Sequence, residues 1–178
     1  RVDGRPALSV TFTAKGVQFF DQEEIYLDPD NFFPLMIKRD LDIFGKEEKI
    51  VEFYDSQKGL VRVVKTVKGE TTEQVIKNGQ RFDNIYGFIY RYRRFGSLKD
   101  EGEFNLHLPT RDVKFTLVKK KEFSAGGRTF EACYLRGAPG KINVWFDSGL
   151  NKIPLKIDGA LGFGNASMVF REYLEGAR

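Results

Sequence analysis

Hydrophobic and polar residues alternate with a period of two along much of the chain. In the segment that begins at Leu8, apolar Val10 and Phe12 alternate with polar Ser9 and Thr11. Successive side chains of a β-strand point to opposite faces, so this alternation is typical of a strand with one buried face. The pattern predicts an antiparallel β protein whose strands include residues 8–14, 50–54, 61–67, 113–117, 130–135, 142–146, 153–157 and 168–170.

Short runs rich in Gly, Asn and Asp separate several of these predicted strands. Such residues adopt the backbone conformations that tight hairpin turns require. Strands spaced about 8–12 residues apart are typical of a sandwich, a barrel or a curled sheet. We predict a mainly all-β fold, namely a single antiparallel, strongly curled sheet or a half-open or closed barrel of about 9–12 strands. The predicted hairpin turns are 55–59, 68–70, 78–79, 124–127 and 147–151.

One segment, residues 83–95, departs from the alternation. Its apolar residues from Ile85 to Tyr92 are spaced i, i+3, i+4 and i+7, which places them on one face of a helix. Asp83 is the predicted N-cap, and Gly96 is the predicted end of the helix. We therefore predict one short helix near 83–95 within the β protein.

Length and charge limit the kind of protein this can be. The chain has 178 residues and shows no internal repeat or break in composition, so we predict a single β-rich domain over residues 1–178. Lys and Arg number 29 against 25 Asp and Glu, and the two signs are interleaved, unlike the basic patch typical of nucleic-acid-binding proteins. No apolar run approaches the roughly 20 residues of a membrane helix. We expect neither a nucleic-acid partner nor a transmembrane span.

The sequence offers few residues for catalysis or metal binding. Its one Cys and one His cannot form an intramolecular disulfide or a Cys/His zinc site. His107 lies between two leucines and is interpreted as structural, and Cys133 as a small hydrophobic residue of a strand. The oxygen-rich segment 28–31 fits a calcium loop or an ordinary turn, and we favour the turn. We predict no catalytic residue, no metal, no cofactor and no enzymatic activity.

Several segments carry a resemblance to a known family. They are a tryptophan-containing strand at 144–147, an Ile-Pro strand at 152–157, a Gly-Phe-Gly stretch at 162–164, the segment 83–91 and the opening strand 8–16. Together they resemble the domain-of-unknown-function 3108 family of bacterial proteins. The resemblance implies a β-rich protein of the cell envelope that is exported to the periplasm, with a signal peptide removed. The short turn after Phe146 departs from the longer acidic or serine-rich turn of the family.

The 17 phenylalanines suit either a large solid core or an apolar cavity, and the sequence leaves this choice open. Our first hypothesis is a non-enzymatic periplasmic protein that binds a hydrophobic ligand, such as a lipid acyl chain, on a concave sheet. The alternatives are a structural or partner-docking module of an envelope assembly, or a hydrolase that acts on glycan or lipid. The predicted lining residues are Phe12, Phe115, Phe146, Ile157 and Phe170.

Arg91 and Arg94 are the predicted contacts of an anionic head group. They lie in a segment from Tyr90 to Phe95 that mixes arginine and aromatic side chains. Such a surface also suits single-stranded nucleic acid, and a solvated basic helix face gives the same pattern. These alternatives stay open at the level of the sequence.

Overall fold

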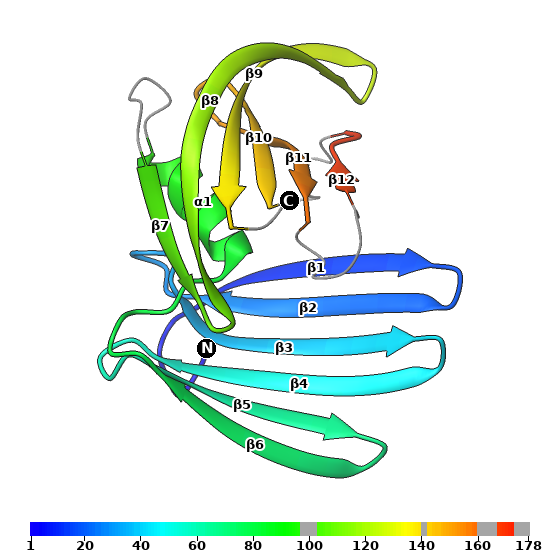
Figure 1. Ribbon diagram of the computed structural model, residues 1–178, viewed down its shortest axis with the longest axis vertical. Helices are drawn as coiled ribbons and strands as arrows, with labels where there is room; N and C mark the ends of the chain where they lie inside the picture. The colour runs from blue at the N-terminus through cyan, green and yellow to red at the C-terminus, as the bar shows by residue number, and fades with distance from the viewer. Residues whose placement is uncertain (97–102, 140–141, 160–166, 173–178) are drawn as a thin grey trace. The chain divides into compact units, whose positions relative to one another are not determined.

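The computed structural model describes residues 1–96, 103–139, 142–159 and 167–172. Its described part contains twelve strands and one helix, α1 (Ile85–Phe95) (Figure 1). The strands are β1 (Leu8–Gly16), β2 (Phe19–Leu27), β3 (Pro34–Ile43), β4 (Lys46–Asp55), β5 (Leu60–Val67), β6 (Glu70–Lys77), β7 (Glu103–Leu108), β8 (Arg111–Ala125), β9 (Arg128–Ala138), β10 (Asn143–Asp147), β11 (Pro154–Asp158) and β12 (Ser167–Val169).

The strands form two antiparallel sheets of six strands each. The first has the order β1-β2-β3-β4-β5-β6 and the second has the order β12-β11-β10-β9-β8-β7. The predictions of a mainly antiparallel β fold and of one short helix near 83–95 are confirmed. The prediction of a single sheet was wrong, and neither sheet closes into a barrel. Alternation reports which face a residue occupies but carries no information on where a sheet ends, so it did not reveal the division.

By its contacts the chain divides into two compact units. Unit 1 comprises Arg1–Arg91 and His107–Arg111, and unit 2 comprises Tyr92–Leu106 and Asp112–Arg178. The prediction that residues 1–178 fold as a single domain stays a prediction. Within the described residues, no helix is long and apolar enough to cross a membrane.

The first sheet is a simple meander of hairpins in unit 1. The turn between β5 and β6 consists of Lys68 and Gly69, whose φ angles of 51° and 83° are the left-handed values that a two-residue hairpin requires. The predicted hairpin at 78–79 was wrong, because this segment leads from β6 toward α1. The oxygen-rich segment 28–31 forms the turn between β2 and β3, where Asp28 Oδ1 accepts hydrogen bonds from two backbone amides.

Helix α1 begins with a cap different from the predicted one. Asn84 Oδ1 accepts hydrogen bonds from the amides of Tyr86 at 2.8 Å and of Gly87 at 3.2 Å, so Asn84 is the N-cap and the prediction of Asp83 was wrong. Gly87 lets the helix approach the loop after β2, because a Cβ atom at this position would lie 2.8 Å from the carbonyl oxygen of Phe32. The first part of the helix is thereby packed tightly against unit 1.

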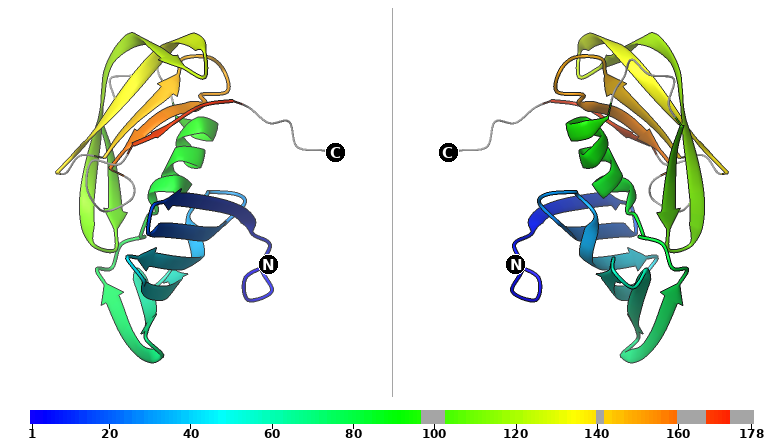
Figure 2. Two further views of the ribbon diagram at one scale, coloured as in Figure 1. Left: turned by 90° about the vertical axis from the view of Figure 1, so that its right-hand side faces the viewer. Right: turned by 90° about the vertical axis from the view of Figure 1, so that its left-hand side faces the viewer.

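The core of unit 2 lies on one face of the second sheet. Phe115 on β8 and Phe146 on β10 are fully buried. The ring of Tyr92, in the last part of α1, lies 5.1 Å from the rings of both Phe146 and Phe104. The helix ends before Gly96, as predicted. Strands β8 and β9 are the longest of this sheet and bend together (Figure 2).

Candidate functional site

Unit 1 carries charged side chains on a sheet face that the alternation would assign to the apolar core. Asp21 and Glu23 of β2 lie on the same face as Ile25, and their exposed fractions are 0% and 8%. Arg39 of β3 is the register partner of Glu23. Glu52 of β4 continues this face, because it is the register partner of Ile37 and Ile37 faces Ile25. We call Asp21, Glu23, Arg39 and Glu52 the ionic cluster.

Arg39 is held by Asp21. Its Nε donates to Asp21 Oδ1 at 2.8 Å and its Nη2 donates to Asp21 Oδ2 at 2.5 Å. This bidentate arrangement is the strongest form of an arginine–carboxylate contact. Glu23 lies further away, with Oε1 3.4 Å from the same Nε. Asp21 thus compensates the charge of Arg39. Glu23 is a second buried acid, and its electrostatic contact with Arg39 is weaker.

The position of Glu23 changes its acidity. Burial raises the pKa of Glu23 to about 7, Arg39 opposes this rise, and the negative charges of Asp21 and Glu52 add to it. Burial likewise raises the pKa of Glu52, while a hydrogen bond from the Tyr54 hydroxyl opposes that rise. Near neutral pH, the ionic cluster therefore takes up and releases protons at Glu23.

Tyr86 of α1 faces the ionic cluster. Its ring stacks on Phe12 with a centroid distance of 5.1 Å, and Phe12 is the register partner of Glu23. Only 6% of Tyr86 is exposed, and its hydroxyl has no hydrogen-bond partner among the described residues. Burial, and then the charges of Glu23 and Asp21, raise the pKa of Tyr86. Phe12, a predicted ligand-lining residue, is thus a packing partner of this tyrosine.

Arg91 is engaged inside unit 1. Its Nη2 donates to Asp83 Oδ1 at 2.5 Å, and its guanidinium lies 4.1 Å from the ring centre of Phe33. Asp83 is 3% exposed, and burial raises its pKa against the opposing effect of Arg91. Arg94 is exposed, with its guanidinium 5.8 Å from the ring of Phe95. The predicted role of both arginines in binding a head group stays a prediction.

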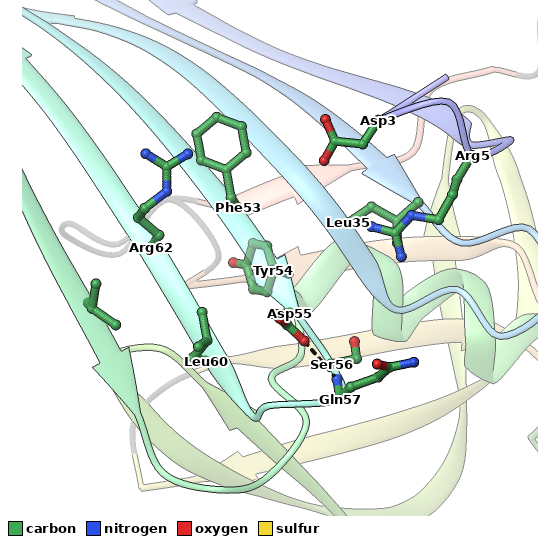
Figure 3. Close-up of a pocket in the computed structure, with 11 residues that line it drawn as sticks. Asp3, Arg5, Leu35, Phe53, Tyr54, Asp55, Ser56, Gln57, Leu60 and Arg62 are labelled. Atoms are coloured by element: carbon green, nitrogen blue, oxygen red, sulfur yellow. Dashed lines mark hydrogen bonds between the residues drawn. The ribbon is translucent and has the colours of Figure 1, made fainter.

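A groove lies at the end of the first sheet, near the turn between β4 and β5 (Figure 3). Its volume is about 470 Å³, within the range of about 300–1,000 Å³ that is usual for small-molecule sites. Apolar side chains and two arginines line it together. The lining residues are Asp3, Arg5, Leu35, Phe53, Tyr54, Asp55, Ser56, Gln57, Leu60, Arg62 and Val75.

The register of three neighbouring strands builds the apolar part of this groove. Phe53 of β4 is paired with Arg62 of β5, which is paired with Val75 of β6. The guanidinium of Arg62 lies 4.3 Å from the ring centre of Phe53 and 3.5 Å from Glu73. Figure 3 shows Arg62 beside Phe53 and Arg5 beside Leu35. The groove thus combines an apolar surface with guanidinium groups.

The carboxylate of Asp55, which lines the groove, is bound by residues of the turn between β4 and β5. Asp55 Oδ1 accepts hydrogen bonds from the amides of Gln57 and Lys58, and Asp55 Oδ2 lies 3.2 Å from Lys58 Nζ. The amide hydrogen bonds and the charge of Lys58 lower the pKa of Asp55. Asp55 therefore stays ionised and serves to order the groove's rim.

The predicted lining residues are divided between the two units, with Phe12 in unit 1 and the other four in unit 2. Phe115 and Phe146 belong to the packed core of unit 2, which favours the solid-core interpretation for these two. Ile157 and Phe170 are half-buried in unit 2, and the ring of Phe170 lies 5.9 Å from that of Phe130. None of the seven predicted site residues lines the groove of unit 1. Their role in ligand binding stays a prediction.

Neither the groove nor the ionic cluster was predicted from the sequence. The alternation around Phe53 assigned faces to β4, but the pairing of Phe53 with Arg62 and Val75 depends on strand register. Within the described part of the chain, no group of three or more His, Cys, Asp or Glu side chains is arranged to hold a metal ion.

Comparison with known proteins identifies a family. A family model described as a protein of unknown function, DUF3108, matches residues 1–171 of the chain. Comparison with curated proteins found no match. Comparison with solved structures found none either.

Proposed function

Because the chain belongs to the DUF3108 family, whose description states no activity, we propose its function from its own residues. We propose a non-enzymatic protein of the bacterial envelope that binds an amphiphilic ligand, an acyl chain with an anionic head group. The binding site in this proposal is the groove of unit 1. The observation that carries the proposal is the close approach of apolar side chains and guanidinium groups around a volume of about 470 Å³.

The apolar part of the groove would supply most of the affinity. Phe53, Leu60 and Val75 contribute hydrocarbon surface to it, and Val75 is 56% exposed. Removal of apolar surface from water is worth roughly 25 cal/mol per Å², so each 100 Å² of covered acyl chain would contribute about 2.5 kcal/mol. An acyl chain bound in the groove would remove this apolar surface from water, which favours binding.

The arginines would orient the head group. Arg5 and Arg62 line the groove, and Asp55 is engaged by Lys58 and by the amides of its turn. A guanidinium group presents several N–H donors in a planar fork that matches a carboxylate or phosphate. The proposal therefore favours an anionic head group over an uncharged one.

The contacts of Asp21 argue against a role for this side chain as a catalytic carboxylate. A catalytic pair of carboxylates needs at least one oxygen that reaches the substrate. Both oxygens of Asp21 are bound by Arg39, and the side chain is fully buried. Location in the periplasm rests on the resemblance to exported bacterial proteins described above.

The test is binding of myristate to the purified protein, measured by isothermal titration calorimetry. We expect myristate to bind and Val75→Glu to weaken its binding at least tenfold, because the new carboxylate enters an apolar surface and repels the head group. Val17→Glu is the matched control, since Val17 is 94% exposed in unit 1 and does not line the groove. Myristyl alcohol, with the same chain but no charge, tests the role of the arginines. Equal myristate binding by Val75→Glu and the unsubstituted protein would contradict the proposal.

A further inference from the structure

One face of the second sheet carries a cluster of aromatic side chains. Tyr134 of β9 and Trp145 of β10 are register partners whose ring centres lie 4.4 Å apart. The ring of Phe123 lies 6.2 Å from that of Trp145, and Phe123 is the register partner of Phe130. All four side chains are half-buried. We call Phe123, Phe130, Tyr134 and Trp145 the aromatic face.

The aromatic face is distinct from the core face of the same sheet. Along β10, Val144 and Phe146 alternate with Trp145, and both are fully buried. Phe146 packs against Tyr92 of α1, so the core of unit 2 lies on the Phe146 side. Since neighbouring residues of a strand point to opposite faces, Trp145 points away from this core.

Basic side chains surround the aromatic face. Arg128 and Arg136 occupy the same side of β9 as Phe130 and Tyr134, and both are exposed. Lys121 is exposed on β8, paired with Ala132 of that side. Lys156, the register partner of Trp145, has its Nζ 4.8 Å from the Trp145 ring centre.

Fewer acidic groups share this side of the sheet. Asp147 lies two residues after Trp145, and Asp158 lies two residues after Lys156. Asp158 is 3.1 Å from Lys156 Nζ, so these two charges compensate each other. Lys114 of β8 also lies on this side, and its Nζ is 2.6 Å from Glu103, so these two charges compensate each other as well. Lys121, Arg128 and Arg136 then face Asp112 and Asp147, which leaves the described residues of this side with an excess of one positive charge.

We propose that the aromatic face docks on the surface of an anionic lipid bilayer. Trp and Tyr concentrate where a membrane meets water, because their rings are apolar and their N–H or O–H groups stay hydrated. Each basic residue near an anionic membrane surface raises the affinity for the membrane by roughly fivefold, which corresponds to about 1 kcal/mol. The combination of both residue types on one sheet face matches that surface in hydrophobicity and in charge.

The ring arrangement favours a membrane over single-stranded nucleic acid. Stacking of bases needs aromatic faces that are free to receive them. Trp145 lies between Tyr134, Phe123 and Lys156, so its faces are already in contact with other side chains. Tyr134 and Lys156 therefore compete with a base for the faces of the Trp145 ring. This inference uses residues of unit 2 only and does not rest on the groove of unit 1.

The single Trp of the chain makes the inference directly testable, because all tryptophan fluorescence comes from Trp145. The purified protein is titrated with vesicles of phosphatidylglycerol and phosphatidylcholine in equal parts, and with vesicles of phosphatidylcholine alone. We expect a blue shift of Trp145 emission, and quenching by brominated acyl chains, with the anionic vesicles. About 1 M salt should abolish both effects, since it shortens the Debye length to about 3 Å.

The double variant Arg128→Gln/Arg136→Gln tests the charges, and both positions are exposed, so folding should be preserved. Its affinity for the anionic vesicles should fall about 30-fold. The matched control, Lys46→Gln/Lys77→Gln, removes two exposed positive charges from unit 1 and should leave binding unchanged. Val75→Glu should also leave vesicle binding unchanged, which separates this inference from the proposed ligand site.

Three results would overturn the inference. One is equal binding to both vesicle types. Another is co-sedimentation with anionic vesicles while Trp145 emission does not change, which would show that a different face docks. The third is a response of Trp145 to a single-stranded oligonucleotide but not to the vesicles.

Discussion

Replacement of Glu23 by Gln should make the protein more stable at alkaline pH. Burial raises the pKa of Glu23 from 4.5 to about 7 in the folded protein. Between these two values the folded state holds a proton that the unfolded state has released, so stability falls as the pH rises through this range. At 1.36 kcal/mol per pKa unit, the interval corresponds to a loss of about 3 kcal/mol as an upper limit.

Gln at position 23 cannot ionise and has nearly the same size as Glu. Glu23 is 3.4 Å from Arg39, whose stronger contacts are with Asp21, so the variant leaves no unpaired arginine. We expect the free energy of unfolding of Glu23→Gln, relative to the unsubstituted protein, to rise by up to about 3 kcal/mol between about pH 4 and pH 9. Urea unfolding followed by far-ultraviolet circular dichroism at several pH values measures this difference.

The control is Glu24→Gln, which removes a carboxylate from the next position of β2, on the opposite face. The prediction concerns the difference between the two variants, so that the general effect of one lost negative charge cancels. A carbon-13 NMR titration of the Glu23 carboxyl group should give a midpoint near 7. The reasoning would be refuted if Glu23→Gln became less stable than the unsubstituted protein at high pH, since an ionised Glu23 would then stabilise the fold through Arg39.

Two further substitutions test the packing of unit 1. Gly87→Ala should lower the free energy of unfolding by about 1–3 kcal/mol, because its Cβ atom would lie 2.8 Å from the Phe32 carbonyl oxygen. This loss should outweigh the higher helix propensity of Ala. Urea unfolding measures the difference, and a gain in stability would contradict the close contact. Arg39→Met should cost about 3–5 kcal/mol, because it leaves Asp21 buried without its partner. Adding Asp21→Asn to Arg39→Met should recover part of that loss in the same assay, and no recovery would argue against the ion pair as the cause.

The strands that the sequence predicted have apolar residues at every second position along at least one face. Val113, Phe115 and Leu117 alternate with polar residues, and they lie within β8. Strands β2 and β3 were missed because Asp21, Glu23 and Arg39 occupy the buried face, where the pattern expects apolar residues. The same charged residues that hid these strands form the ionic cluster.

Three further features were not predicted correctly, namely strand β6, the cap of α1 and the groove. Strand β6 was missed because nearly all its side chains are exposed and most are polar, so it has no apolar alternation. The predicted cap Asp83 lies one residue before the actual cap, Asn84, and pairs instead with Arg91. The groove needs the register that sets Phe53, Arg62 and Val75 side by side, and local alternation does not determine register.

The most direct test of amphiphile binding locates the ligand on the protein. Nitrogen-15 NMR spectra recorded during addition of myristate should show their largest shifts at the backbone amides of Phe53, Arg62 and Val75, with small shifts at Phe115 and Phe146 in the core of unit 2. Shifts centred on unit 2, or no saturable shifts at all, would contradict the assignment of the ligand site to the groove.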